Sequence, residues 1–120
     1  MKIKVSIPSI TQLLGERRLS ITGSKSETNR LLLLKALYPQ FKIENASNSD
    51  DSEVMTHILK NSHHPSPITH HPEINVHHAG TAMRFLTAYF AIQEGKEVIL
   101  TGSSRMKERP IKILVDALNQ

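Results

Sequence analysis

Apolar residues recur along the chain with two different periods, and the pattern predicts short strands that alternate with helices. Strand-like runs occupy Lys2–Ile7, Leu19–Thr22, Phe41–Glu44, Glu73–His77 and Glu97–Thr101. Helical patterns run from Lys25 or Ser26 to about Tyr38, from Asp50 to about Lys60, from Gly80 to about Ala91, and from Ile111 to Leu118. Because glycine or serine turns follow the strands, we expect an α/β or α+β fold.

Prolines and apolar-poor stretches predict where these elements begin and end. Pro39 should end the first helix, whose four successive leucines, Leu31–Leu34, we expect in the core. Pro110 suits the first turn of the last helix. The stretch 61–72, which has three prolines and little apolar content, and the stretch 102–107 are predicted loops.

Composition narrows the class of protein. The chain has 120 residues, which suits one small domain, with 38% hydrophobic and only 4% aromatic residues, so its core should be mainly aliphatic. It has no cysteine, no signal-like apolar segment at its start and no run long enough to span a membrane, which favours a cytoplasmic protein. The formal net charge of +4 suits either a small anionic substrate or nucleic acid.

One turn carries chemistry of its own. The run from Gly23 to Arg30 reads GSKSETNR and leads from a predicted strand into the apolar helix. A helix N-terminus has unpaired N–H groups and the positive end of the helix dipole, so with Lys25 and Arg30 it favours a phosphate or a carboxylate. It lacks the second glycine of a Walker loop. The alternative is an ordinary N-cap with solvated charges.

Two further runs, HAGTAMRFLT at 78–87 and LTGSSRMKERPI at 100–111, favour the anion site at this turn over an ordinary N-cap. Together with the turn at 23–30 and Ser49-Asp50-Asp51, they resemble, in order, the beginning of 5-enolpyruvylshikimate-3-phosphate synthases, the 3-phosphoshikimate 1-carboxyvinyltransferases. The RMKERPI run is the most specific of the matches. The resemblance covers nearly the whole chain.

The resemblance implies a shikimate-pathway enzyme of aromatic amino-acid (chorismate) biosynthesis. Such an enzyme transfers the enolpyruvyl group of phosphoenolpyruvate to the 5-hydroxyl of shikimate 3-phosphate, with neither metal nor organic cofactor. It also implies a monomer of two domains built from βαβαββ units around a substrate cleft. On that analogy residues 1–18 form a crossover strand and linker of the other domain, and 19–120 are a partial substrate-binding domain, one unit and part of a second. The chain then looks truncated, needs the remainder of the parent enzyme as its partner, and is expected to be inactive alone.

The resemblance also implies roles for individual residues. Lys25 would touch both substrates beside the reacting centre, Ser26 would donate a hydrogen bond to shikimate 3-phosphate, and Arg30 would pair with its carboxylate. For phosphoenolpyruvate, the Gly80 N–H and Thr81 would line the pocket at a helix start. Arg105 would bind the phosphate, whereas Arg109 would tie its loop down. Each residue also has an ordinary structural alternative, such as a turn glycine, an N-cap or a solvated charge.

Several features depart from this pattern or compete with it. His78 stands where the family usually has asparagine, and the segment from Lys60 to Glu73 is shorter than usual. The histidines recur at seven-residue spacing, but prolines interrupt any helix there, so we expect a polar loop and no metal site. The absence of cysteine argues against the related cell-wall enolpyruvyl transferase. Two other functions stay open: a non-catalytic anion-binding module, and a basic nucleic-acid binder, which the few aromatic residues disfavour.

Overall fold

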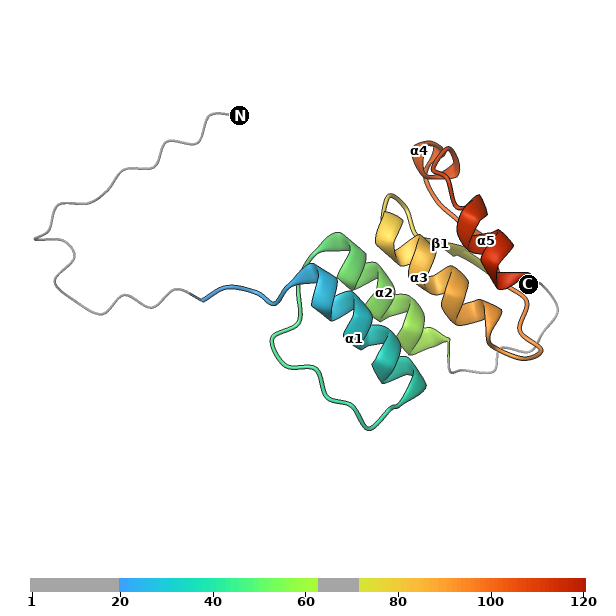
Figure 1. The fold of residues 1–120 in the computed structure, drawn as a ribbon. Helices are drawn as coiled ribbons and strands as arrows, with labels where there is room; N and C mark the ends of the chain where they lie inside the picture. Colours follow the sequence, from blue (N-terminus) through green and yellow to red (C-terminus); the bar gives the residue numbers. More distant parts are fainter. Residues whose placement is uncertain (1–19, 63–71) are drawn as a thin grey trace, which may run out of the picture.

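The computed structural model describes residues 20–62 and 72–120. In chain order these residues form α1 (Lys25–Leu37), α2 (Asp50–Asn61), β1 (Glu73–Asn75), α3 (Gly80–Ala91), β2 (Ile99–Thr101), α4 (Ser104–Lys107) and α5 (Lys112–Leu118) (Figure 1). The fold is therefore a mixture of helices with a small parallel sheet, in agreement with the expected class. No helix in the described ranges is long and apolar enough to cross a membrane.

The ends of α1 follow from local sequence. Ser24 is its N-cap, and the Ser24 hydroxyl accepts a hydrogen bond from the backbone N–H of Glu27 at 3.4 Å. The helix ends at Leu37, because the residue that precedes Pro39 is disfavoured in helical conformation. The predicted limits of α1 are confirmed within one residue. Gly23 is required by a close approach, since a Cβ atom there would lie 1.9 Å from the Asn45 carbonyl oxygen.

The leucine run in α1 is buried on one side only. Leu32 is buried, Leu33 packs against the core, and Leu31 and Leu34 are about two-fifths exposed. Four successive side chains, about 100° apart, point to all sides of the helix, whereas α2 and α3 cover only part of it. The expectation that all four leucines lie in the core is therefore wrong for Leu31 and Leu34.

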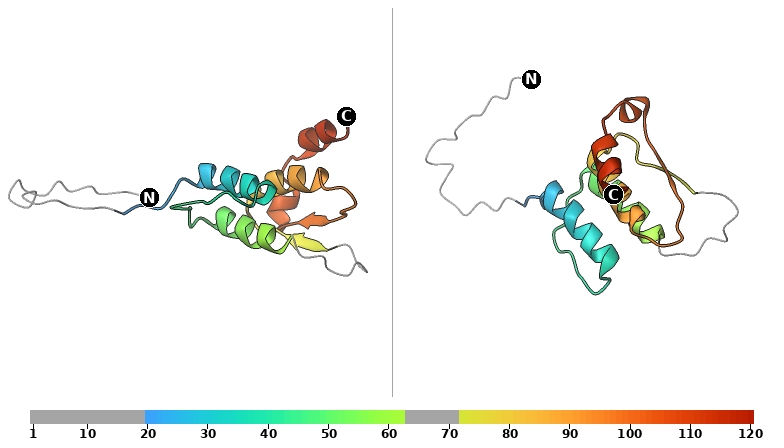
Figure 2. Two further views of the ribbon diagram at one scale, coloured as in Figure 1. Left: turned by 90° about the horizontal axis from the view of Figure 1, so that it is seen from below. Right: turned by 45° about the vertical axis from the view of Figure 1, so that its right-hand side comes forward.

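Strands β1 and β2 pair in parallel, with Ile74 opposite Leu100, and α3 connects them. The connection is a β-α-β unit, the arrangement that parallel pairing requires. In the left view of Figure 2, α1 and α3 lie in one layer, while α2 and the two strands lie in a second. Buried side chains of α1, α2, α3 and α4, and of the segment between β1 and α3, form the core. Its members are Leu32, Met55, Leu59, Val76, Ala79, Ala82, Leu86, Tyr89, Phe90 and Met106.

Two predicted strands are absent, and one predicted loop is a helix. Residues 20–22 and 41–44 have no strand pairing, and both Ile21 (72%) and Phe41 (47%) are exposed. Alternating sequence forms a strand only when a neighbouring strand supplies hydrogen bonds, and in the described residues only β1 and β2 pair. Within the predicted loop 102–107, α4 forms instead, because the Ser103 hydroxyl caps the N–H of Met106.

The remaining predicted elements are confirmed, and the strands and α5 are shorter than predicted. Strands β1 and β2 cover three residues each of longer predicted runs, and α2 and α3 begin where expected. Helix α5 starts two residues after Pro110, with Ile111 as its N-cap, so Pro110 precedes the first turn. The predicted strand Lys2–Ile7 and most of the predicted loop 61–72 lie outside the described residues.

Candidate anion-binding cleft

The first turns of three helices converge on one cleft of about 440 Å³, which we call the N-terminal cleft. Its lining includes the first residue of α1, the first two of α2 and the first two of α3. The lining residues are Lys25, Ser49, Asp50, Asp51, His78, Gly80, Thr81 and Arg109. Each helix start directs unpaired N–H groups and a partial positive charge toward the cleft.

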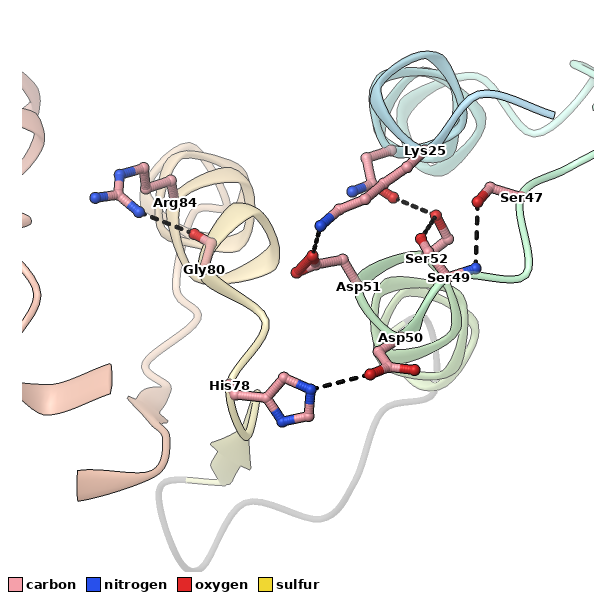
Figure 3. A network of polar contacts seen from close by, with 10 residues as sticks. Lys25, Ser47, Ser49, Asp50, Asp51, Ser52, His78, Gly80 and Arg84 are labelled. Atoms are coloured by element: carbon pink, nitrogen blue, oxygen red, sulfur yellow. Dashed lines mark hydrogen bonds and ion pairs between the residues drawn. The ribbon is translucent and has the colours of Figure 1, made fainter. Parts of the chain in front are cut away.

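Lys25 is held in the N-terminal cleft by an acidic partner. Its ammonium pairs with Oδ1 of Asp51, and the Lys25 side chain is 50% exposed whereas that of Asp51 is only 9% exposed (Figure 3). The other oxygen of the carboxylate, Oδ2, is buried and has no hydrogen-bond partner among the described residues. A carboxylate in the first turn of α2 also lies favourably in that helix dipole. The pair therefore fixes the ammonium while half of the Lys25 side chain stays exposed.

His78 and Asp50 form a second link across the cleft. The Nε2 atom of His78 lies 3.0 Å from Oδ2 of Asp50, and both side chains are largely exposed (Figure 3). This contact joins the segment before α3 to the start of α2, and it is an ion pair only when the imidazole is protonated. A single hydrogen bond is what a histidine can offer in place of an asparagine amide.

The side chains of two arginines lie close to the start of α3. A Cβ atom on Gly80 would lie 2.3 Å from Nη1 of Arg109, so glycine is what allows that guanidinium to approach. Arg84 donates from Nη1 to the Gly80 carbonyl at 3.1 Å and from Nη2 to the Pro110 carbonyl at 3.2 Å. Arg84 therefore ties the segment before α5 to α3, a role we had expected of Arg109. Arg109 itself lines the cleft.

The structure brings together three of the six predicted site residues. Lys25, Gly80 and Thr81 line the N-terminal cleft. Ser26 and Arg30 lie outside its lining and contact each other, with Nη1 of Arg30 donating to the Ser26 carbonyl at 2.8 Å and also to the Ser26 hydroxyl. Arg105 is exposed on α4 and is also outside the lining.

Three charged members of the cleft, Asp50, Asp51 and Arg109, are not among the site residues that the sequence predicts. Asp50 and Asp51 enter the sequence analysis only within a run that belongs to the resemblance, and Arg109 only as a residue that ties its loop down. A signal for Asp50 and Asp51 existed, because both belong to a run that is part of the resemblance. Nothing in the local sequence separates Arg109 from Arg105, since both are loop arginines in one basic run.

Comparison with known proteins then decides the family. The model of the family described as EPSP synthase (3-phosphoshikimate 1-carboxyvinyltransferase) matches residues 9–120. The chain belongs to the EPSP synthase family. Residues 23–30 and 78–87, which together line much of the cleft, both lie within the match.

Curated relatives agree with the family match. The chain is 39% identical over 119 aligned positions to the 3-phosphoshikimate 1-carboxyvinyltransferase of Hamiltonella defensa, covering 83% of this chain and 28% of the relative. It is 40% identical over 103 positions to the Bacteroides fragilis enzyme of that name, covering 85% and 23%. For Actinobacillus pleuropneumoniae the identity is 37% over 138 positions, covering 98% and 32%. The chain thus spans about a quarter to a third of these relatives' length. No solved structure matches it.

Proposed function

We propose that this chain supplies one part of the substrate site for the transfer of an enolpyruvyl group from phosphoenolpyruvate to the 5-hydroxyl of shikimate 3-phosphate. The names of the relatives support the reaction, which belongs to the shikimate pathway. Both substrates are polyanions, and each phosphate carries up to about two negative charges near neutral pH. The part of the site that binds them must therefore be electropositive.

The convergence of three helix starts on Lys25 is the observation that carries the proposal. Each helix N-terminus contributes roughly half a positive charge, and α1, α2 and α3 all contribute at the same cleft. Asp50 and Asp51 offset part of this field. An incoming phosphate therefore competes with Asp51 for the Lys25 ammonium, which makes binding by this cleft alone weak and sensitive to salt.

The proposed roles are those that the resemblance implies, and the position of Lys25, Gly80 and Thr81 in one cleft supports three of them. Lys25 contacts both substrates, and the N–H of Gly80 with Thr81 binds phosphoenolpyruvate at the start of α3. Ser26 and Arg30 bind shikimate 3-phosphate, which must then extend beyond the described cleft along α1. Arg105 requires α4 to turn toward the cleft before it reaches the phosphoenolpyruvate phosphate. No metal or organic cofactor is needed for these roles.

We further propose that the rest of the site lies on the remainder of a longer enzyme. Residues 1–18 would belong to its second domain, and 19–120 would be a partial substrate-binding domain of βαβαββ design, in a monomeric cytoplasmic enzyme. The described cleft has no wall opposite the three helix starts that would remove the substrates from water. By itself the 120-residue chain acts as a non-catalytic anion-binding module, and we expect no enolpyruvyl transfer from it.

The test is an NMR titration of the 120-residue chain with shikimate 3-phosphate at low salt. A dissociation constant near 1 mM corresponds to about 4 kcal/mol, which a few partly exposed charged contacts can supply. Amides 23–30 should shift first, and amides 80–81 should respond to phosphoenolpyruvate. Lys25→Ala should remove both responses and leave the fold intact.

Two controls sharpen this titration. Lys112→Ala removes an exposed lysine of α5 and should leave both responses unchanged. A DNA oligomer tests the nucleic-acid alternative and should give no response centred on the cleft. Shifts that persist in Lys25→Ala, or that centre on residues outside both the cleft and residues 23–30, would show that the proposed site is wrong.

A further inference from the structure

Asn29 is a polar side chain with no exposure to solvent, one helical turn beyond Lys25 on α1. Its Oδ1 atom accepts a hydrogen bond of 2.7 Å from the hydroxyl of Ser52, while its Nδ2 atom has no partner among the described residues. A fully buried amide that satisfies only one of its two ends is costly, so packing alone does not explain it. Its one strong bond joins α1 to the first turn of α2.

That bond belongs to a chain of hydrogen bonds that runs back to α1. The hydroxyls of Ser52 and Ser49 lie 3.0 Å apart, and because the Ser52 proton is used on Asn29, Ser49 is the donor. The Ser49 N–H donates to the Ser47 hydroxyl at 3.2 Å (Figure 3). The Ser47 N–H in turn donates to the Thr28 hydroxyl at 2.9 Å. The first turn of α2 is thus attached to two adjacent residues of α1.

The attachment determines where Asp51 lies. Asp51 directly precedes Ser52, is 6% exposed, and forms the ion pair with Lys25. Lys25 and Asn29 are four residues apart and lie on the same face of α1. The Lys25–Asp51 and Asn29–Ser52 contacts are therefore neighbouring links between α1 and α2. A shift of the Asn29–Ser52 contact therefore also shifts the Lys25–Asp51 ion pair.

We propose that Asn29, acting through Ser52, is a positioning residue that holds the Asp51 carboxylate, and through it the Lys25 ammonium, at the mouth of the N-terminal cleft. The part of this inference that concerns ligand binding rests on the proposed function above. The geometric part, that Asn29 controls the Lys25–Asp51 pair, does not depend on any ligand.

The first experiment therefore uses no ligand. A double-mutant cycle with Lys25→Ala and Asp51→Ala, read by urea unfolding of the 120-residue chain, measures the coupling between the two residues. We expect a measurable coupling in the wild-type chain and none when the cycle is repeated in the Asn29→Leu background. Equal coupling in both backgrounds overturns the inference.

The second experiment separates positioning from stability. Asn29→Leu and Ser52→Ala each leave a buried group without its partner and should destabilise the chain, whereas the double variant replaces both polar ends by apolar groups and should regain stability. We expect this double variant to recover its free energy of unfolding but not its affinity for shikimate 3-phosphate. Shikimate 3-phosphate should bind roughly threefold to tenfold more weakly than to wild type, as for the loss of one well-placed charged contact. Wild-type affinity in the stable double variant overturns the inference.

A matched control lies one turn further along α2. The hydroxyl of Thr56 donates to the Ser52 carbonyl at 2.7 Å, within the same helix. Thr56→Val removes a hydroxyl from α2 without touching the link to Asn29, and it should change neither the coupling nor the affinity. A loss of coupling in Thr56→Val as large as that in Asn29→Leu would show that general loosening of α2 is the cause. If wild type fails to bind shikimate 3-phosphate, the proposed function fails, while the ligand-free cycle still decides the role of Asn29.

Discussion

Helices α1 and α5 both carry runs of aliphatic residues, yet the protein uses them differently. In α1, Leu32 is buried against a core that includes α2 and α3, and the polar end of the same helix carries Lys25 into the cleft. In α5 no residue is buried, and Ile113 is 85% exposed although α5 packs beside α3. Figure 1 shows why: α3 stands between the two helices, and α1 also has α2 beside it. Burial depends on how many neighbours a helix has, not on how apolar its sequence is.

The largest effect that this contrast predicts is on stability. Met55 in α2 has no exposed surface, so Met55→Ala should lower the free energy of unfolding by about 2–5 kcal/mol through lost burial and a new cavity. Ile113→Ala in α5 should change it by about 0.5 kcal/mol or less, because that side chain is already in water. Urea unfolding monitored by circular dichroism measures both. A large loss in Ile113→Ala would mean that α5 contributes to the core in solution.

A smaller difference in stability is expected between variants of two glycines that lie outside α1 and α5. A Cβ atom on Gly102, between β2 and α4, would lie 2.8 Å from the His77 carbonyl oxygen, so Gly102→Ala should destabilise the chain by about 1–3 kcal/mol. At Gly80 in the cleft the nearest atom is the movable end of Arg109, so Gly80→Ala should cost about 0.5 kcal/mol or less. Gly80→Ala should instead weaken the response to phosphoenolpyruvate. Thermal unfolding and the NMR titration test the pair, and equal destabilisation by both variants would contradict the prediction.

The smallest effect concerns the ion pair of α5. Lys112 donates to both carboxylate oxygens of Asp116, at 2.6 and 2.8 Å, but the side chains are 83% and 53% exposed. Such a pair, with lysine four residues before aspartate, contributes at most a few tenths of a kcal/mol. Asp116→Asn should therefore shift the urea midpoint barely at all, and added salt should remove even that difference. By contrast, Asp51→Asn should alter the cleft response to phosphate.

The helix limits were the most predictable part of the fold, because helix ends are decided by nearby residues. Ser24 caps α1, Pro39 ends it, and the acidic first turn of α2 suits the dipole of that helix, so each acts within a few positions of the end that it sets. The strands were less predictable, because a strand forms only with a partner. The alternating residues 20–22 and 41–44 have none among the described residues, whereas Glu73–Asn75 and Ile99–Thr101 pair across α3.

In the site, too, some features depend on nearby residues in the sequence and others depend on the packing of distant elements. The sequence by itself determined the family, the apolar α1 and the candidates Lys25, Gly80 and Thr81, because the motifs that contain them are continuous in the chain. Only the tertiary structure decided that these candidates share a cleft with Asp51 and Arg109, and that Arg105 lies outside it. The physical reason is distance along the chain: α1, α2 and α3 begin at Lys25, Asp50 and Gly80, which lie 25 to 55 residues apart, and the packing of whole helices brings their first turns to one cleft.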